Sequence, residues 1–556
     1  MIVLWFLALL SSCSSIACED DPRVVRTSLG EIKGSYKESY GGKKYLAFEG
    51  VPYALPPVGH RRFRPPEPVS RWEGTLTATK IANACIQLQH NNKYPDYEVV
   101  GDEDCLYLNI YVPQRDTRQQ EPLAVLFGIH GGAYQFGEAF TGVQFLMDEE
   151  DTIVVTVAYR LGSFGFLSTE DDVLSGNMGL KDQSTALRWV AENIADFGGD
   201  PDRITLFGNS AGSASVHYHY LSPWSRGLFQ NGVSFSGSSY GPGKQTEHAR
   251  EKARRLADLL GCPSEELAEM VECLRYRPAR SIAQATKHFM PWMYNPFTPF
   301  GPVVEYQGDR PFVNRPPVEI IADGDAFDAL WIAGIVSEEG LYPVAEYANN
   351  DAYLRELDEN WETIAPHLLD FNFTIPLEQH AEVARKIRWH YFGDRPIDRR
   401  SVDRLIKLVG DRLYVVDIEK AARDQAQKNR SPVLVYYYSY RALTSQSDYY
   451  SHSMKDYGVS HGDDISMIID RDNIYPPLNT RDRLMQKKLI RFLVSVAKKS
   501  FPDVGIDFDW QPVNAKRAEL DYLHIRSPCN IKMESNDNLA EKNFWSSIRF
   551  NENILL

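Results

Sequence analysis

Six short runs of apolar, β-branched residues constrain the fold of this 556-residue chain more than any other feature. Runs without polar alternation suit strands that are buried on both faces of a sheet. Helical patterns lie between them, for example over residues 182–193 and 247–260. This order predicts an α/β fold with a mostly parallel central sheet and helices on both faces. The runs are residues 123–129, 153–159, 204–207, 232–235, 330–336 and 433–440.

The two ends of the chain depart from this pattern. Residues 29–36 and 44–48 alternate in polarity on either side of two adjacent glycines, which suits antiparallel strands at the leading edge of the sheet. No repeat, charge block or Gly/Ser linker interrupts the chain after them, so we expect one domain over residues 19–526. Residues 527–556 are polar and rich in asparagine, have little to bury, and are expected to form a loose tail.

Residues 1–18 have the features of a secretory signal peptide, because an apolar run over residues 2–10 is followed by small residues and then by acidic ones. Cleavage is expected after Ala17 or Cys18. The apolar run is too short to cross a bilayer, so no membrane span is expected, and the predicted location is secreted and extracellular. On that route Asn372, in Asn-Phe-Thr, is a candidate for N-glycosylation.

Charge and motif content exclude several classes of function. Seventy-five acidic against 60 basic residues give a net charge of -15, which repels phosphate backbones, so no nucleic acid partner is expected. The chain has no zinc-protease motif, no paired-cysteine metal motif, no phosphate-binding loop and no dinucleotide glycine motif. We therefore expect neither a metal nor another cofactor. The sequence leaves the oligomeric state open.

One motif indicates nucleophilic chemistry. Gly208-Asn-Ser210-Ala-Gly212 follows the apolar run at residues 204–207 and precedes a stretch of small residues, which is the context of a nucleophile elbow. Glycines on both sides remove Cβ atoms that would collide in so tight a turn, and they leave the Ser210 hydroxyl above the sheet. Ordinary Gly/Ser turns also match this pattern, so a catalytic serine requires an acid and a base elsewhere in the chain.

Candidates for that acid and base follow in the chain order of α/β-hydrolases. The apolar run at residues 330–336 leads into two adjacent acids at the carboxyl end of a strand, and we select Glu339 over Glu338, which we expect to be solvated. His461 lies in a glycine-flanked loop and is selected over His452, which lacks such glycines. An imidazole that a carboxylate holds in one tautomer can activate a serine hydroxyl.

Donors for an anionic intermediate are expected after residues 123–129. The segment His130-Gly-Gly-Ala133 resembles the HGGG-type loop that supplies backbone amides in α/β-hydrolases. We predict an oxyanion hole made by the amides of Gly132, Ala133 and Ala211. The loss of one such donor typically raises a reaction barrier by about 2.7 to 4 kcal/mol.

Seven cysteines in a chain expected to be secreted favour disulfides over metal ligands. Two pairs bracket short loops and could close local bridges, namely Cys85 with Cys105 and Cys262 with Cys273. Cys529 then pairs with Cys18, if cleavage spares it, or is a free or intermolecular thiol.

Longer segments resemble one family. Residues 197–212 are similar to the serine signature of the type-B carboxylesterases and lipases, which include the cholinesterases, and residues 103–113 are similar to the second signature of that family. Shorter matches extend the resemblance over most of the chain, at residues 50–54, 56–59, 62–66, 177–183 and 300–304. The resemblance implies an α/β-hydrolase fold with Ser210, Glu339 and His461 as a catalytic triad.

The resemblance also implies structural bonds. The two bracketing cysteine pairs match disulfides of the family. Two ion pairs carry over as well, Arg62 with Glu103 and Arg160 with Asp182. Buried charges of this kind are costly to break singly.

Two departures from the family pattern narrow the range of substrates that we expect. Cholinesterase-like members carry a tryptophan in the first disulfide loop and an acid just before the serine. This chain has no tryptophan between Cys85 and Cys105, and Asn209 precedes the serine. A site for a quaternary ammonium is therefore not expected. The chain looks most similar to secreted insect-type carboxylesterases. Juvenile hormone esterases usually have glutamine at position 209, so that activity is disfavoured.

The resemblance implies a secreted serine esterase that cleaves small-molecule carboxylic esters to a carboxylate and an alcohol through an acyl-serine. A juvenile-hormone-type or lipid esterase stays open as an alternative. A non-catalytic binding or adhesion module is the alternative from another class, since some members of the family have that role. The aromatic-rich residues 289–300 either line the acyl pocket or belong to the core.

Overall fold

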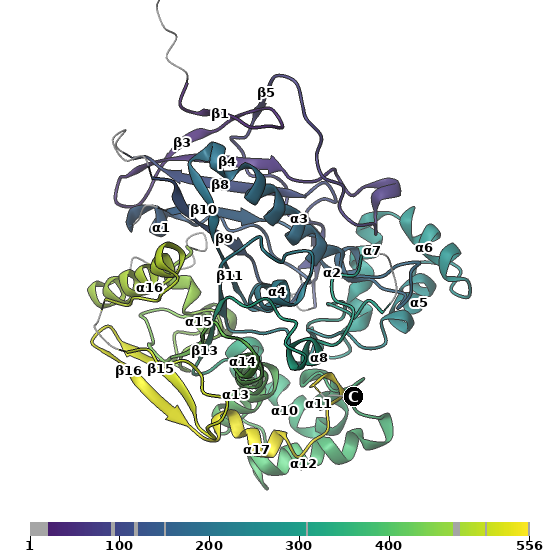
Figure 1. The fold of residues 1–556 in the computed structure, drawn as a ribbon. Helices are drawn as coiled ribbons and strands as arrows, with labels where there is room; N and C mark the ends of the chain where they lie inside the picture. The colour runs from purple at the N-terminus through teal and green to yellow at the C-terminus, as the bar shows by residue number, and fades with distance from the viewer. Residues whose placement is uncertain are drawn as a thin grey trace, which may run out of the picture.

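The computed structural model describes most of the chain (Figure 1). The described residues are 21–89, 95–115, 121–149, 152–306, 310–470, 479–505 and 509–553. The predicted signal peptide, residues 1–18, lies outside this part. Within the described residues, no helix combines the length and the apolar character that crossing a bilayer requires.

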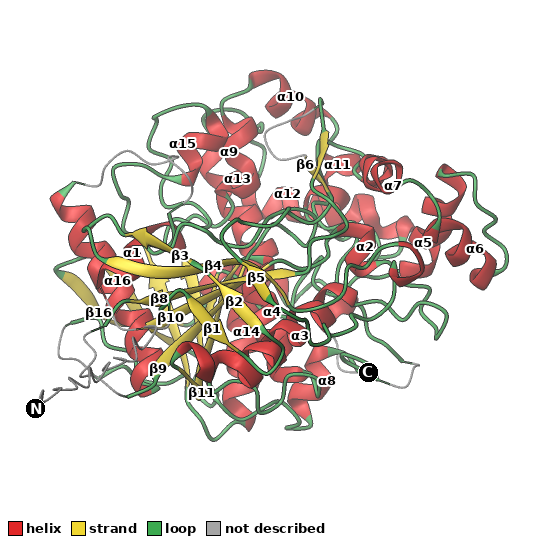
Figure 2. Ribbon diagram, turned by 90° about the horizontal axis from the view of Figure 1, so that it is seen from above, coloured by secondary structure: helices red, strands yellow, loops and turns green. Residues whose placement is uncertain are grey.

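Eleven strands of the described chain form one mixed sheet at the centre of the molecule, with helices around it (Figure 2). Neighbouring strands from β10 to β15 run parallel, and antiparallel pairs close both edges. Each of the six apolar runs forms one of the parallel strands, which confirms the predicted α/β sheet. In spatial order the strands are β16 (Asn530–Asn536), β15 (Leu520–Ser527), β14 (Val433–Tyr438), β13 (Leu330–Val336), β12 (Asn231–Phe235), β11 (Gly199–Asn209), β9 (Leu123–Ile129), β10 (Thr152–Val157), β8 (Tyr107–Pro113), β4 (Lys44–Pro52) and β3 (Ser35–Glu38).

Alternate side chains of one strand point to opposite faces of this sheet, and each face has its own core. In β13, Trp331 and Ile335 pack on one face, whereas Ile332 and Val336 pack on the other. Three helices cover the first face: α3 (Met178–Asn193), α4 (Ala211–Leu221) and α14 (Val416–Lys428). The second face is covered by α16 (Thr480–Lys499) and α1 (Gln144–Glu149).

The leading edge is antiparallel, as predicted. β3 pairs antiparallel with β4, and β4 pairs antiparallel with β8. Two small sheets lie outside the main one, the first made of β1 (Val24–Arg26), β2 (Glu31–Lys33) and β5 (Thr75–Thr77), and the second of β6 (Gln87–Gln89) and β7 (Glu98–Val100).

The remaining helices stand around these layers. They are α2 (Gly162–Phe166), α5 (Ala249–Leu259), α6 (Leu267–Arg275), α7 (Ala279–Ala285), α8 (Pro317–Ala322), α9 (Leu341–Ala348), α10 (Asp351–Glu359), α11 (Trp361–Leu368), α12 (His380–Phe392), α13 (Val402–Gly410), α15 (Gln446–Ser451) and α17 (Lys542–Trp545). A π-helical turn, Asp411–Val415, joins α13 to α14.

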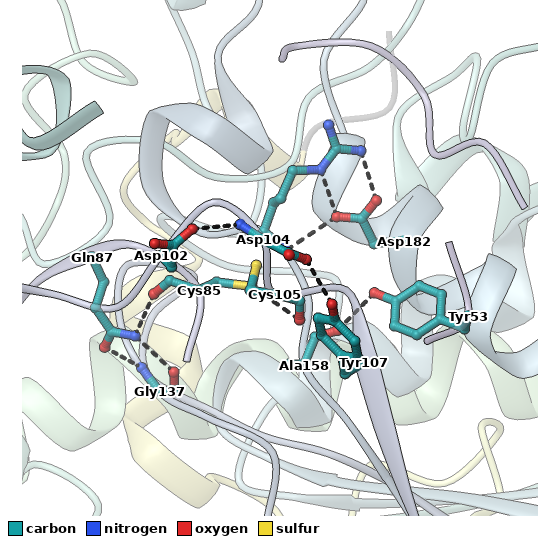
Figure 3. The surroundings of a disulfide bond; sticks show 11 residues. Tyr53, Cys85, Gln87, Asp102, Asp104, Cys105, Tyr107, Gly137, Ala158 and Asp182 are labelled. Carbon is teal, nitrogen blue, oxygen red and sulfur yellow. Dashed lines mark hydrogen bonds and ion pairs between the residues drawn. A yellow bond between two sulfur atoms is a disulfide. The ribbon is translucent and has the colours of Figure 1, made fainter. Parts of the chain in front are cut away.

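Both expected disulfides are present, and both expected ion pairs form. Cys85 is bonded to Cys105, whose surroundings are shown in Figure 3, and Cys262 is bonded to Cys273. Cys529, between β15 and β16, is exposed and has no disulfide partner among the described residues, outside which Cys18 lies. The closest contacts of the ion pairs are 2.6 Å each, for Arg62 with Glu103 and for Arg160 with Asp182.

The loose tail expected after residue 526 is wrong for the described residues 527–553. β16 adds a strand to the sheet, and α17 follows it beside α12 (Figure 1). Trp545 is buried, and Glu552 forms an ion pair of 2.6 Å with Arg412 in which both side chains are almost fully buried. The average composition of residues 527–556 does not predict this packing, because a few buried side chains are enough to hold a mostly polar segment against the rest of the protein.

Candidate active site

Ser210 lies in the turn between β11 and α4, with a backbone φ of 59° and ψ of -119°. Residues other than glycine rarely adopt this conformation, which is maintained only where the surroundings enforce it. The backbone segments around the serine are packed tightly enough to enforce this conformation. A Cβ on Gly208, for example, would lie 2.5 Å from the backbone of Gly212. A Cβ on Gly212 would lie 2.1 Å from the carbonyl oxygen of Ile129 at the end of β9. The two glycines therefore let strand, turn and helix approach at contact distance.

The loop after β9 packs directly against this turn. A Cβ on Gly131 would lie 3.1 Å from the Ser210 Cβ. Gly132 and Ala133 follow with φ of 108° and 53°. Within the described residues, no acceptor takes the amide proton of Gly132 or Ala133. Ala211 is the first residue of α4, where helix amides have no partner inside the helix. Gly132 and Ala133 line one cavity with Ser210, and Ala211 follows the serine in the chain.

The first disulfide loop is bonded through Gln87 to the loop that follows β9 (Figure 3). The Gln87 side chain donates to the carbonyl oxygens of Cys85 and Gly137, at 2.8 and 2.9 Å. It also accepts from the Gly137 amide at 2.8 Å. Gly137 closes the loop that begins at His130, so Gln87 ties that loop to the disulfide. The sequence carries no signal for this role of Gln87.

His461 and Glu339 form a buried pair. The His461 Nδ1 lies 2.6 Å from a carboxylate oxygen of Glu339, and the other oxygen accepts from the Val336 amide at 2.9 Å. The exposed fractions are 7% for His461 and 1% for Glu339. The His461 Nε2 is buried and has no hydrogen-bond partner among the described residues. A proton on Nδ1 leaves the lone pair of Nε2 available to a hydroxyl.

The residues that were not selected as acid and base, Glu338 and His452, differ in their burial. His452 is exposed at the end of α15. Glu338 is not solvated as expected but half-buried, and its carboxylate accepts from the Val459 amide at 2.7 Å. Glu338 also forms a β-bridge with Ser460, the residue before His461. Adjacent acids at the end of β13 therefore split their tasks, because one faces the imidazole and the other holds the loop that carries it.

A cavity of about 280 Å³ connects these groups. It is lined by Ser210, His461, Gly132, Ala133, Tyr342 and Tyr450 among others. The wall is mostly apolar, which lowers the local dielectric and strengthens electrostatic interactions inside it. The structure thus brings together the serine, the imidazole with its carboxylate, and the predicted amide donors.

Sequence reasoning missed the aromatic and acidic groups around His461. Tyr414 and Tyr342 pack with ring centroids 4.5 and 5.8 Å from the imidazole. Burial raises the pKa of Asp463 to about 7 and that of Asp464 to about 6. The two tyrosines come from segments far from His461 in the chain, so no local pattern marks them. Asp463 and Asp464 follow His461 directly in the sequence, but their burial is decided by the fold.

Comparison with known proteins gives concordant results. The model described as the carboxylesterase family matches residues 21–545. The chain is 49% identical over 534 residues to venom carboxylesterase-6 of Apis mellifera, covering 96% of this chain and 95% of that protein. It is 50% identical over 544 residues to a carboxylic ester hydrolase of Bombus ignitus, again covering 96% and 95%. The crystal structure of juvenile hormone esterase from Manduca sexta, with OTFP covalently attached, matches with a TM-score of 0.82 and 28% identity, over 94% of this chain and 99% of that one.

Proposed function

Since this chain belongs to the carboxylesterase family and hydrolyses small carboxylic esters, we propose that Ser210, His461 and Glu339 perform the reaction through an acyl-serine. The observation that carries the assignment is the 2.6 Å pair of His461 and Glu339 in one cavity with a serine whose backbone is strained. Strained backbone is retained where function or packing requires it.

In the first half of the reaction, the Ser210 hydroxyl oxygen attacks the carbonyl carbon of the ester. The hydroxyl proton passes to Nε2 of His461, and the carbonyl oxygen becomes an oxyanion. Glu339 fixes the imidazole by accepting the Nδ1 proton in a hydrogen bond, and it stabilises the imidazolium. The tetrahedral intermediate then collapses, the C–O bond to the alcohol breaks, and Nε2 returns the proton to the departing alcohol oxygen.

In the second half, water takes the place of the alcohol. His461 accepts a proton from water, the resulting hydroxyl attacks the acyl carbon, and the proton then passes to the Ser210 oxygen as the carboxylic acid leaves. The amides of Gly132, Ala133 and Ala211 donate to the oxyanion in both halves. Backbone donors held by a tight loop need no reorganisation when the charge develops, which is why such sites stabilise it strongly.

The protein acts outside the cell in this proposal. Residues 2–10 supply the apolar part of a secretory signal. The two disulfides support an oxidising route, because such bonds are rare in the cytosol. Asn372 lies half-buried beside α11 and is the proposed glycan acceptor.

Labelling with a fluorophosphonate, followed by peptide mapping, tests the nucleophile. We expect one adduct, on Ser210, and loss of aryl ester hydrolysis in parallel with labelling. The Ser210→Ala variant should bind substrate but lose at least about 10³-fold in kcat. An adduct on another serine, or near-normal hydrolysis by Ser210→Ala, would contradict the assignment.

Ser215→Ala is the matched control. Ser215 lies on α4, the helix that begins directly after Ser210, is fully buried, and its hydroxyl donates to the carbonyl of Ala211 at 2.9 Å. The substitution removes a serine hydroxyl five residues after the proposed nucleophile, without touching the loop that holds Ser210. Its labelling and turnover should remain close to those of the unmodified enzyme.

A further inference from the structure

Lys244 is a buried lysine whose ammonium forms no conventional polar contact. Its exposed fraction is 6%. Among the described residues, the ammonium makes neither a hydrogen bond nor an ion pair, and Asp370, Asp417 and Glu339 are charged neighbours at longer range. Burying an ammonium in this way is costly. Such a group is a candidate for a functional role when it lies near a reaction centre.

Two aromatic contacts connect this ammonium with the catalytic base. The Lys244 Nζ lies 5.4 Å from the ring centroid of Tyr414, and the Tyr414 ring lies 4.5 Å from that of His461. On a second route, Nζ lies 5.9 Å from the Phe297 ring, which packs 5.7 Å from Tyr342. Tyr342 in turn lies 5.8 Å from the imidazole. One aromatic ring therefore separates the positive charge from His461.

The chain places both partners at irregular points of the backbone. Lys244 follows Gly241 and Gly243, which have φ of 94° and 69° and bend the loop after β12 inward. Tyr414 lies on the π-helical turn between α13 and α14. Turns of this kind often occur at functional sites, because the extra residue redirects side chains.

The acids around Lys244 neutralise it only in part. Burial lowers the pKa of Lys244 to about 8, while Asp370, Asp417 and Glu339 attract the charge and Arg412 repels it. Burial raises the pKa of Asp370 to about 6 and that of Asp417 to about 7, so Asp417 is partly protonated near neutral pH. The field of the ammonium consequently reaches Glu339, the carboxylate that holds His461.

We propose that Lys244 is a positioning residue that sets the lower pH limit of catalysis, since its buried charge disfavours protonation of the free base His461. The proposal rests on the proposed function, in which the imidazole must be neutral to accept the serine proton. A unit charge about one ring away, at an effective dielectric near 20, changes such a protonation equilibrium by about one pH unit.

Other titratable groups also face the imidazole. On the elements packed against it these are Glu339, Tyr342, Tyr414, Tyr450, Asp463 and Asp464. Across the cavity lie Glu138, Asp470 and His130. All of these residues are retained when only Lys244 is replaced, so a shift in the pH profile reports on the loss of the ammonium, acting on His461 directly or through Glu339.

The test is the pH dependence of kcat/KM for a neutral aryl ester, measured for the full-length enzyme at constant ionic strength. In Lys244→Met we expect the acidic limb to move up by about one pH unit, while the plateau above it changes by less than about threefold. Lys244→Arg keeps the charge, so its acidic limb should stay at the position of the unmodified enzyme. If the methionine variant does not fold, Lys244→Gln removes the same charge.

Lys252→Met is the matched control. Lys252 lies on α5, its ammonium lies 4.8 Å from the Phe373 ring, and burial lowers its pKa to about 8 as well. Asp370 attracts it, but Glu339 is not among its charged neighbours. The acidic limb of this variant should not move.

The outcomes separate the two proposals. If fluorophosphonate labels Ser210 in a neutral Lys244 variant and the acidic limb coincides with that of the unmodified enzyme, the role of Lys244 is wrong. The same holds if Lys252→Met moves the limb equally. If Ser210 is not labelled in the unmodified enzyme, the proposed triad fails instead.

Discussion

The turn that carries Ser210 and the C-terminal segment are held in place by opposite means. Around the serine, backbone packs on backbone, with glycines at the contacts between β9, β11 and α4. In the C-terminal segment, side chains bind partners far away in the sequence, as Glu552 does with Arg412 and as the Trp545 indole does with the Tyr391 hydroxyl at 2.9 Å. Backbone contact leaves a glycine pattern in the sequence, whereas pairing of distant side chains leaves none.

The largest effect is expected where the backbone contact is tightest. In Gly212→Ala, the new Cβ would meet the Ile129 carbonyl at 2.1 Å and push the turn away from the loop after β9. Displacements of about 1 Å at a reaction centre cost about 10²-fold in rate, so kcat/KM for an aryl ester should fall at least about 100-fold. Steady-state kinetics with the purified variant measure this.

Gly324→Ala is the control for this substitution. Gly324 has a φ of 78°, and no heavy atom lies within 4 Å of the Cβ position. The variant carries backbone strain without a collision, so its kcat/KM should stay within about threefold of the original. Equal activity of the two variants would show that the turn tolerates the displacement.

The C-terminal segment should respond in stability rather than in rate. In Glu552→Gln, Arg412 loses the charged partner of a buried ion pair, which typically lowers the free energy of unfolding by about 3 to 5 kcal/mol. Activity of the folded fraction should persist, since Glu552 does not line the catalytic cavity. Urea denaturation and kinetics on the same sample separate the two effects.

Glu362→Gln breaks an exposed ion pair with Arg385 and provides the reference. Exposed pairs are worth about 0 to 1 kcal/mol, so this variant should unfold close to the original midpoint. If Glu552→Gln is no less stable than Glu362→Gln, the buried pair does not anchor the segment.

A smaller effect is expected in the pH dependence of stability, which should differ between α4, next to Ser210, and the surroundings of Arg412. On α4, burial lowers the pKa of His217 to about 4 from an ordinary value near 6.5. Its stabilising contribution is therefore complete above about pH 6.5 and is lost as the pH falls toward 4. Near Arg412, the pKa of Asp417 is raised to about 7, so its contribution is lost as the pH rises toward 7.

His217→Gln tests the acidic side of this contrast. The amide can keep a bond to Gln425, whereas the titrating ring is gone. Between pH 6.5 and 4, Tm should fall less steeply than in the original protein, from a lower starting value. His452→Gln, at an exposed position, should retain the original slope. A parallel slope in His217→Gln would show that another group causes the loss of stability in acid.

Local patterns predicted much of the fold and part of the site. The apolar runs predicted β9, β10, β12, β13 and β14 to within two residues of their ends, because burial on both faces leaves no room for polar residues. They missed the first five residues of β11, which are mostly polar. The choice of Glu339 and His461 used the position of the acid at a strand end and the glycines beside the histidine. The same reasoning failed for Glu338, whose carboxylate binds the Val459 amide more than 100 residues away in the sequence.

The sequence by itself determined the α/β sheet and the glycine-lined turn at Ser210, since each depends on residues that are neighbours in the chain. It also fixes the chain order of the proposed serine, acid and base, which needs no knowledge of contacts. The tertiary structure alone decided that Glu552 pairs with Arg412, that Glu338 holds the loop of His461, and that Lys244 lies one ring from the imidazole. These contacts depend on which distant side chains meet after the sheet and its helices have packed. Burial then sets their charges, because the dielectric around a side chain is a property of the folded molecule.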